Sequence, residues 1–266
     1  MSVIIVGVPC FLIITLRGGI FFLLLINLII LLGLREFYLL LEAKGYRPYK
    51  YLGIFCGLGV CWYVYREGVF LSLLLTLTLM LLMIRELFRR DMSHALINIA
   101  VTVLGVLYVG WLGSHLVMLR ELPGVVGVPD DVGARLVFFA VLITWFGDTA
   151  AYLIGVAIGR HRLLPRVSPK KTIEGAVGGL LGSAGAGLLC SLTFLDFVTP
   201  LAGTLLGLAG GVCGQLGDLV ESLMKRDVGI KDTAGLLPGH GGVLDRFDSL
   251  LFCGPFMYYY FRFFVV

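Results

Sequence analysis

Long apolar runs, separated by short polar connections, fill most of this 266-residue chain. Only 14% of the residues are charged, whereas an ordinary soluble domain carries about a quarter. So much apolar surface requires a bilayer, in which helices or a closed barrel must satisfy every backbone polar group. The runs do not alternate with polar residues, so they predict helices. The expected fold is an all-α polytopic integral membrane protein.

Nine apolar runs are candidates for crossing the membrane. They cover residues 2–16, 18–34, 50–65, 68–84, 95–119, 135–158, 173–195, 200–224 and 248–265. The first two would be too long for one crossing, so we expect a break at Arg17-Gly18-Gly19. We divide the chain into residues 1–134, with about five spans, and residues 135–266, a C-terminal region that contains the most polar loops.

Lys and Arg are concentrated in every second connection. Four connections hold sixteen of the 21 basic residues: residues 35–50, 85–94, 159–172 and 225–247. Basic connections favour the cytoplasmic side of a membrane. The alternation therefore predicts nine spans with the N-terminus inside and with these four connections in the cytoplasm. Residues 120–134, on the opposite side, are expected to form a non-helical loop or a short amphipathic piece.

The most polar stretch covers residues 214–248. Its first part ends an apolar helix and places four polar residues on one face: Asp218, Glu221, Ser222 and Lys225. Its middle, residues 227–242, is rich in Gly and contains Pro238, so it predicts a loop. Asp245 and Asp248 then open the last apolar run on a shared face. Carboxylates beside basic side chains suit a metal ion that carries phosphate, because Mg²⁺ takes one or two carboxylates plus phosphate oxygens.

A second polar stretch covers residues 144–179. Asp148 lies inside an apolar run, where a lone carboxylate costs about 2.5–3.5 kcal/mol, so it is expected to face a partner or a polar cavity. It could serve as an interhelical hydrogen-bond partner or as a group that faces substrate or metal. Downstream, Pro169 blocks a helix, and Ser168 or Thr172 is expected to cap the next one.

Two lysines at that helix start could bind a phosphate, or could lie on anionic lipid headgroups as a basic surface loop. Small residues line the two runs that come after them: Gly178, Gly179, Gly182, Gly185 and Gly187, then Gly203, Gly207, Gly210, Gly211 and Gly214. Such stripes predict close helix packing. Close packing would bring Asp148 and the Lys170–Lys171 segment near Asp218.

The polar residues form a motif: Ser222, Lys225-Arg226, Lys231-Asp232, Pro238-Gly239-His240-Gly241-Gly242, Asp245-Arg246 and Asp248. This motif resembles the signature of the phosphatidate cytidylyltransferases, also called CDP-diacylglycerol synthases. The segment Ser168-Pro169-Lys170-Lys171-Thr172 with Glu174-Gly175 is similar to a block further upstream in that family. The resemblance covers residues 140–255, and Ala234 departs from it where Gly is expected.

The resemblance implies transfer of the cytidylyl group of CTP to phosphatidate, with CDP-diacylglycerol and pyrophosphate as products in phospholipid biosynthesis. It implies Mg²⁺, with a second cation such as K⁺ left open. We expect three metal ligands: Asp218, Asp245 and Asp248. These are also expected to act in catalysis, together with Lys225, Lys231 and Arg246. The expected substrate-binding residues are Asp148, Ser168, Lys170, Lys171, Ser222, Arg226, Gly239, His240, Gly241 and Gly242.

Two other functions stay open from the residues alone. One is a CTP-dependent kinase of polyprenol or another lipid alcohol, which would transfer the γ-phosphate. The other is a transporter in which Asp148 and Asp218 form a cation path. The expected partners are CTP, phosphatidate and the lipid bilayer, with a homodimer left open and no nucleic acid. The expected location is the bacterial inner membrane, with the active site facing the cytoplasm.

Overall fold

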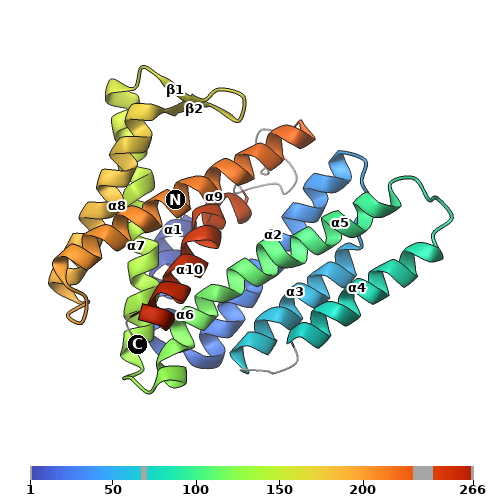
Figure 1. The fold of residues 1–266 in the computed structure, drawn as a ribbon, viewed down its shortest axis with the longest axis horizontal. Helices are drawn as coiled ribbons and strands as arrows, with labels where there is room; N and C mark the ends of the chain where they lie inside the picture. Colours follow the sequence, from blue (N-terminus) through green and yellow to red (C-terminus); the bar gives the residue numbers. More distant parts are fainter. Residues whose placement is uncertain (1, 67–70, 230–241, 265–266) are drawn as a thin grey trace. The chain divides into compact units, whose positions relative to one another are not determined.

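A computed structural model describes residues 2–66, 71–229 and 242–264 of the chain, and these are almost entirely helical (Figure 1). The helices of the first half are α1 (Ser2–Arg17), α2 (Gly19–Ala43), α3 (Lys50–Tyr65), α4 (Leu71–Leu87), α5 (Ala95–Gly105), the π-helical η1 (Val106–Trp111) and α6 (Leu112–Val126). Those of the second half are α7 (Asp131–Ile158), α8 (Ile173–Thr193), α9 (Pro200–Val228) and α10 (Leu244–Phe264). Two short strands, β1 (Arg162–Leu164) and β2 (Ser168–Thr172), separate α7 from α8.

Among the described residues, five helical segments are long and apolar enough to cross a membrane: Gly19–Ala43, Ala95–Val126, Asp131–Ile158, Ile173–Thr193 and Pro200–Val228. Their faces expose large apolar side chains such as Leu24, Leu181 and Leu201, as expected where lipid is the solvent. The predicted all-α polytopic membrane protein is confirmed. The number of nine spans stays a prediction, since α3 and α4 have 16 and 17 residues, fewer than the ~20 of a full crossing.

The chain divides into two compact units. The first contains Met1–Glu121 with Val228–Arg246, and the second contains Leu122–Asp227 with Phe247–Val266. Both α6 and α10 begin in the first unit and end in the second. The division at residue 134 that the sequence suggests stays a prediction.

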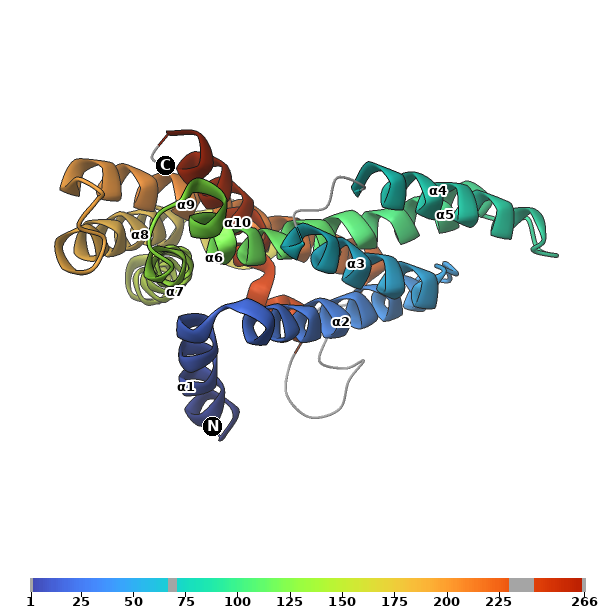
Figure 2. The same cartoon turned by 90° about the horizontal axis from the view of Figure 1, so that it is seen from below.

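In the first unit, α3 lies beside α4, and α4 beside α5 (Figures 1 and 2). The predicted break between the first two apolar runs is confirmed at Gly18, whose φ of +63° suits a residue without Cβ. The buried Arg120 side chain donates hydrogen bonds to the carbonyl oxygens of Thr15 and Leu16, at 2.8 and 3.2 Å. A cation therefore satisfies carbonyl groups at the C-terminal end of α1, where the helix dipole is negative.

Two helices of the first half end later than their apolar runs predict. The run ending at residue 34 continues as helix to Ala43, because residues such as Phe37 and Leu40 are buried against protein. Of the two expectations for residues 120–134, a non-helical loop is wrong as far as Val126, where α6 ends. Hydropathy marks where a helix leaves the apolar layer, whereas the helix itself continues for as long as its side chains find packing partners.

Glu36 on α2 fixes the start of α10 within the first unit. Its two carboxylate oxygens accept hydrogen bonds from the backbone N–H groups of Val243 and Leu244, both at 2.8 Å. The Glu36 residue is only 1% exposed, and Leu244 packs near Gly33, one turn earlier on α2. The carboxylate thus satisfies backbone donors at a helix N-terminus, where the dipole favours negative charge.

In the second unit, α7 and α8 lie side by side and the β-hairpin projects from their shared end (Figure 1). Thr172 caps α8 by accepting a hydrogen bond from the Gly175 N–H at 3.1 Å, which confirms one of the two caps predicted. The strands pair antiparallel, with Arg162 opposite Thr172 and Leu164 opposite Ser168. The basic connection is therefore a hairpin, an arrangement that the sequence did not indicate.

Glycines bring α8 and α9 into backbone contact, as their stripes predict. A Cβ atom placed on Gly187 would overlap the carbonyl oxygen of Gly203 and lie 2.9 Å from the Cα atom of Gly207. A Cβ atom on Gly203 would in turn lie 2.7 Å from the carbonyl oxygen of Gly187. Only residues without a side chain permit this approach, so the predicted close packing is confirmed.

Substitution of Gly187 by Ala is expected to destabilise the second unit, because the new methyl group meets backbone that cannot move aside. Overpacking of this kind costs about 1–3 kcal/mol. The matched control is Gly185→Ala on the same helix, since a Cβ atom at Gly185 has nothing within 4 Å. Ala is preferred over Gly in a helix by about 0.5–1 kcal/mol, so this control should keep or raise stability. Unfolding of the detergent-solubilised protein by SDS measures the stability of both variants. Equal losses of stability in the two variants would contradict the packing argument.

Substitution of Glu36 by Gln is expected to loosen the start of α10, because an amide offers one acceptor where the carboxylate offers two. One buried backbone N–H then lacks its partner, at a cost of about 1–3 kcal/mol. The measurement is amide hydrogen exchange at Val243 and Leu244, which should become faster. Glu42→Gln on the same helix is the control, because Glu42 forms a partly exposed ion pair with Lys50 at 3.1 Å. Unchanged hydrogen exchange in Glu36→Gln would show that the Glu36 clamp, meaning its two hydrogen bonds to the backbone of Val243 and Leu244, does not stabilise the start of α10.

Candidate functional site

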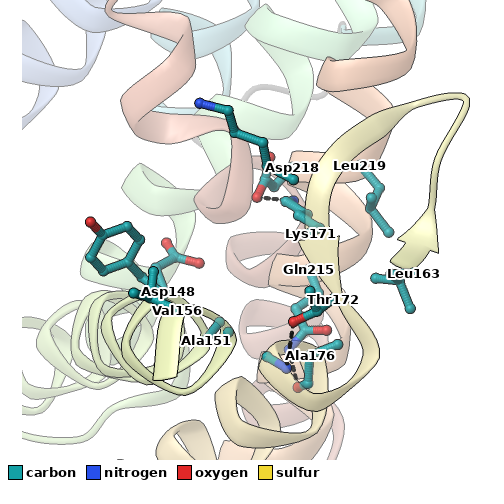
Figure 3. Close-up of a pocket in the computed structure, with 14 residues that line it drawn as sticks. Asp148, Ala151, Val156, Leu163, Lys171, Thr172, Ala176, Gln215, Asp218 and Leu219 are labelled. Atoms are coloured by element: carbon teal, nitrogen blue, oxygen red, sulfur yellow. Dashed lines mark hydrogen bonds and ion pairs between the residues drawn. The ribbon is translucent and has the colours of Figure 1, made fainter. Parts of the chain in front are cut away.

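The second unit contains a cavity of about 530 Å³ that is bounded by α7, the hairpin, α8 and α9 (Figure 3). Its lining combines a charged set, Asp148, Lys170, Lys171 and Asp218, with apolar side chains that include Val156, Leu163 and Leu219. Tyr152, one turn after Asp148 on α7, also lines it. The cavity can therefore accept a molecule that is ionic at one end and apolar at the other.

The charged end is organised around Asp218. The ammonium group of Lys171, from β2, contacts one carboxylate oxygen of Asp218, from α9 (Figure 3). Both side chains are 30% exposed, so the pair faces the cavity rather than the protein interior. The other carboxylate oxygen lies 3.5 Å from the hydroxyl oxygen of Ser222, one turn later on α9.

Two further aspartates share this electrostatic environment. Asp148 interacts with the charges of both Asp218 and Lys171. Asp248 on α10 is buried and interacts with the charges of Asp218 and Asp148. Its carboxylate accepts a hydrogen bond from the Ser249 N–H at 2.6 Å. Like charges repel one another, so this set of carboxylates favours binding of additional positive charge.

The donors fit a hard divalent cation in chemistry. Asp148, Asp218 and Asp248 offer only oxygen atoms, the ligands that Mg²⁺ prefers. In the described ranges, no three Asp, Glu, His or Cys side chains form a ready-made metal site. Mg²⁺ does not require one, because it is commonly held by one or two carboxylates while phosphate and water complete its shell. The cluster therefore suits a cation that arrives with a phosphorylated ligand.

The other predicted site residues of the second unit lie around this cluster. Lys170 lines the cavity, and Ser168 begins β2 opposite Leu164. Lys225 forms an ion pair with Glu221 at 3.0 Å. The Arg226 guanidinium donates a hydrogen bond to the Val167 carbonyl oxygen at 3.0 Å and so ties the end of α9 to the hairpin turn. Their roles in binding or catalysis stay predictions.

Three predicted residues belong to the first unit. Gly242 is buried and precedes α10, while Asp245 and Arg246 lie in the first turn of that helix. Lys231, Gly239, His240 and Gly241 lie outside the described residues. The roles assigned to all seven stay predictions.

The structure adds polar residues that the sequence did not single out as site residues. Gln215 lines the cavity, and its amide donates a hydrogen bond to the Ala176 carbonyl oxygen at 2.8 Å, which joins α9 to α8. Glu174 accepts hydrogen bonds from the backbone N–H groups of Arg160 and His161 and so holds the base of the hairpin. Gln215 precedes Asp218 by three residues, so extending the polar face of α9 backward would have found it.

Comparison with known proteins identifies the family to which this chain belongs. The sequence profile of the Cytidylyltransferase family matches residues 1–264. A Synechocystis protein named phosphatidate cytidylyltransferase is 35% identical over 91% of this chain and 89% of its own length. Proteins of the same name from Bacillus subtilis and Staphylococcus aureus are 38% and 50% identical over 59% and 47% of this chain, which are 55% and 48% of their own lengths. The chain belongs to the Cytidylyltransferase family.

Proposed function

We propose that this protein transfers the cytidylyl group of CTP to phosphatidate, giving CDP-diacylglycerol and pyrophosphate. Membership of the Cytidylyltransferase family and the names of the relatives support this reaction. The structural observation that carries it is the contact between Lys171 and Asp218 at the charged end of a cavity with apolar walls. Such a cavity suits a phospholipid whose phosphate must meet a nucleotide triphosphate.

In the proposed reaction, a phosphate oxygen of phosphatidate attacks the α-phosphorus of CTP. The bond from that phosphorus to the oxygen bridging the α and β positions breaks, and pyrophosphate leaves with the bonding electrons. No general base is required, because a phosphate monoester has a second pKa near 6 and is mostly ionised at pH 7. The chain's task is to position two anions in line and to neutralise their repulsion.

Lys170 and Lys171 are proposed to bind phosphate oxygens at the start of α8, where the helix dipole adds to their positive charge. Asp218 and Asp245 are proposed to hold Mg²⁺, with Asp248 as a further ligand or as support for one. When bound, Mg²⁺ neutralises the charge that develops on the departing pyrophosphate. With a cation on Asp218, the Lys171 ammonium becomes available to a phosphate group. A second cation such as K⁺ stays part of the proposal.

The apolar wall of the cavity is proposed to admit the lipid sideways from the bilayer. Val156 on α7 is exposed there, and so is Tyr152, as expected of side chains that meet acyl chains. The connection of residues 159–172, which contains the hairpin, carries five of the basic residues that indicate a cytoplasmic connection. We therefore propose that the site faces the cytoplasm, where CTP is present, and that the protein lies in the bacterial inner membrane.

The reaction class is tested with purified protein, phosphatidate and CTP labelled separately at the α and γ phosphates. The α label should enter the lipid, whereas the γ label should leave as pyrophosphate, because attack at the α-phosphorus releases the β and γ phosphates together. Thin-layer chromatography of the lipid phase shows whether the α label or the γ label has entered the lipid. Lipid that carries the γ label would instead identify a CTP-dependent lipid kinase.

The metal assignment is tested with Asp218→Asn and Asp245→Asn, which keep shape while removing charge. Each should reduce activity by at least ~100-fold, the equivalent of losing ~3 kcal/mol of transition-state stabilisation. Each should also raise the Mg²⁺ concentration needed for half-maximal activity. The matched control is Asp196→Asn, since Asp196 is 80% exposed and pairs with Arg135 at 3.0 Å away from the cavity lining. Near-normal rates and Mg²⁺ dependence in both test variants would refute the assignment.

A further inference from the structure

A second polar cavity, of about 230 Å³, lies in the first unit. It forms where the connection after α2 meets the connection after α4, and it shares no lining residue with the cavity of the second unit. Its lining side chains include Arg47, Arg89, Asp91, Ser93, His94 and Asn98. The cavity therefore lies between the ends of α2 and α4 and the start of α5.

Hydrogen bonds hold the backbone of this cavity in place. The Arg47 N–H donates to the side-chain oxygen of Asn98 at 2.9 Å. The Arg47 carbonyl oxygen accepts two hydrogen bonds from the Arg89 guanidinium, both at 3.1 Å. That guanidinium also lies 4.5 Å from the centre of the Tyr49 ring, a cation–π contact that fixes its orientation. Two connections far apart in sequence are thus joined into one built site.

Among the charged groups of the cavity, the Arg47 guanidinium is the one that an anion can reach most easily. Arg47 and Arg89 supply two guanidinium groups, and Asp91 supplies one carboxylate inside the lining. Glu86 lies 3.5 Å from Arg89 and offsets part of the charge of that residue. Arg47 is the more available cation, because its side chain is 70% exposed and its ion pair with Asp91, at 3.3 Å, is open to solvent. An exposed pair of this kind is worth about 0–1 kcal/mol, so a phosphate can replace Asp91 on Arg47.

Exposed apolar side chains surround the charged residues on the same segment. Leu87, Phe88, Met92 and Leu96 are between 81% and 83% exposed. They flank Arg89, Asp91 and His94 at the end of α4 and the start of α5. A water-soluble anion would gain nothing from them, whereas the acyl chains of a lipid would cover them.

We propose that this cavity binds the phosphate of an anionic phospholipid headgroup. The Arg47 guanidinium binds the phosphate oxygens, and Arg89 holds the Arg47 backbone in place beside them. Ser93, His94 and Asn98 surround the polar headgroup. The exposed side chains from Leu87 to Leu96 contact the acyl chains. A phosphodiester with one negative charge can replace Asp91 as the partner of the Arg47 guanidinium. This site goes beyond the proposed transfer reaction and requires none of its residues.

The test is native mass spectrometry of the full-length protein in detergent, with phosphatidylglycerol as the probe and phosphatidylcholine as the neutral comparison. CTP is left out, so the result does not depend on the proposed reaction. Phosphatidylglycerol should be retained in preference to phosphatidylcholine. Arg47→Gln should weaken its retention by about tenfold, the scale of one lost charge-assisted hydrogen bond. Asp91→Asn should strengthen retention, because it removes the carboxylate that competes for Arg47.

The matched control is Arg90→Gln, which removes the same charge from a neighbour outside the lining. Equal losses in Arg47→Gln and Arg90→Gln would show only a general basic surface and would overturn the proposal. So would unchanged retention in Arg47→Gln. Competition with inorganic phosphate at millimolar concentration distinguishes a site for a lipid headgroup from a site for free phosphate. If it displaces the lipid completely, the cavity binds free phosphate rather than a headgroup, and the proposal fails.

Discussion

The contact between the Lys171 ammonium and the Asp218 carboxylate is the interaction on which the second unit depends. It places two opposite charges among helices that are otherwise apolar, where either charge alone would be costly. Glycine contacts between α8 and α9 make the meeting possible, because they let the two helices approach closely. The close packing of the helices therefore brings the charged pair to one end of the cavity, where each charge has a partner.

The sequence predicts this arrangement to the extent that its signals are local. Thr172 is recognisable as a cap because Pro169 prevents a helix directly before it, and the glycine stripes mark the faces that pack. Asp148 inside an apolar run indicates a polar cavity, and the structure has one there. These features depend on residues within one or two helical turns of each other, a range that periodicity can describe.

The features that the sequence misses depend on partners far along the chain. Glu36 looks like an ordinary charge at the end of an apolar run, yet its hydrogen-bond partners are 207 and 208 residues away. The sequence does not predict the hairpin, because a Pro followed by two Lys is typical of a surface loop. The pairing of its two strands is set by the turn rather than by hydropathy. The predicted ligand Asp245 belongs to the first unit while Asp218 belongs to the second, so their joint role stays a prediction.

The Glu36 clamp has a consequence for how the protein is made. The first unit consists of the beginning of the chain together with residues 228–246, and the second unit's main segment is synthesised between them. A ribosome therefore releases α2 into the membrane long before the backbone groups that Glu36 binds have emerged. Until then this carboxylate must remain hydrated or find a temporary partner, because a bare charge in lipid is unfavourable. Synthesis of the start of α10 thus completes the earliest part of the protein last, and a chain stalled before residue 243 would leave both units unfinished.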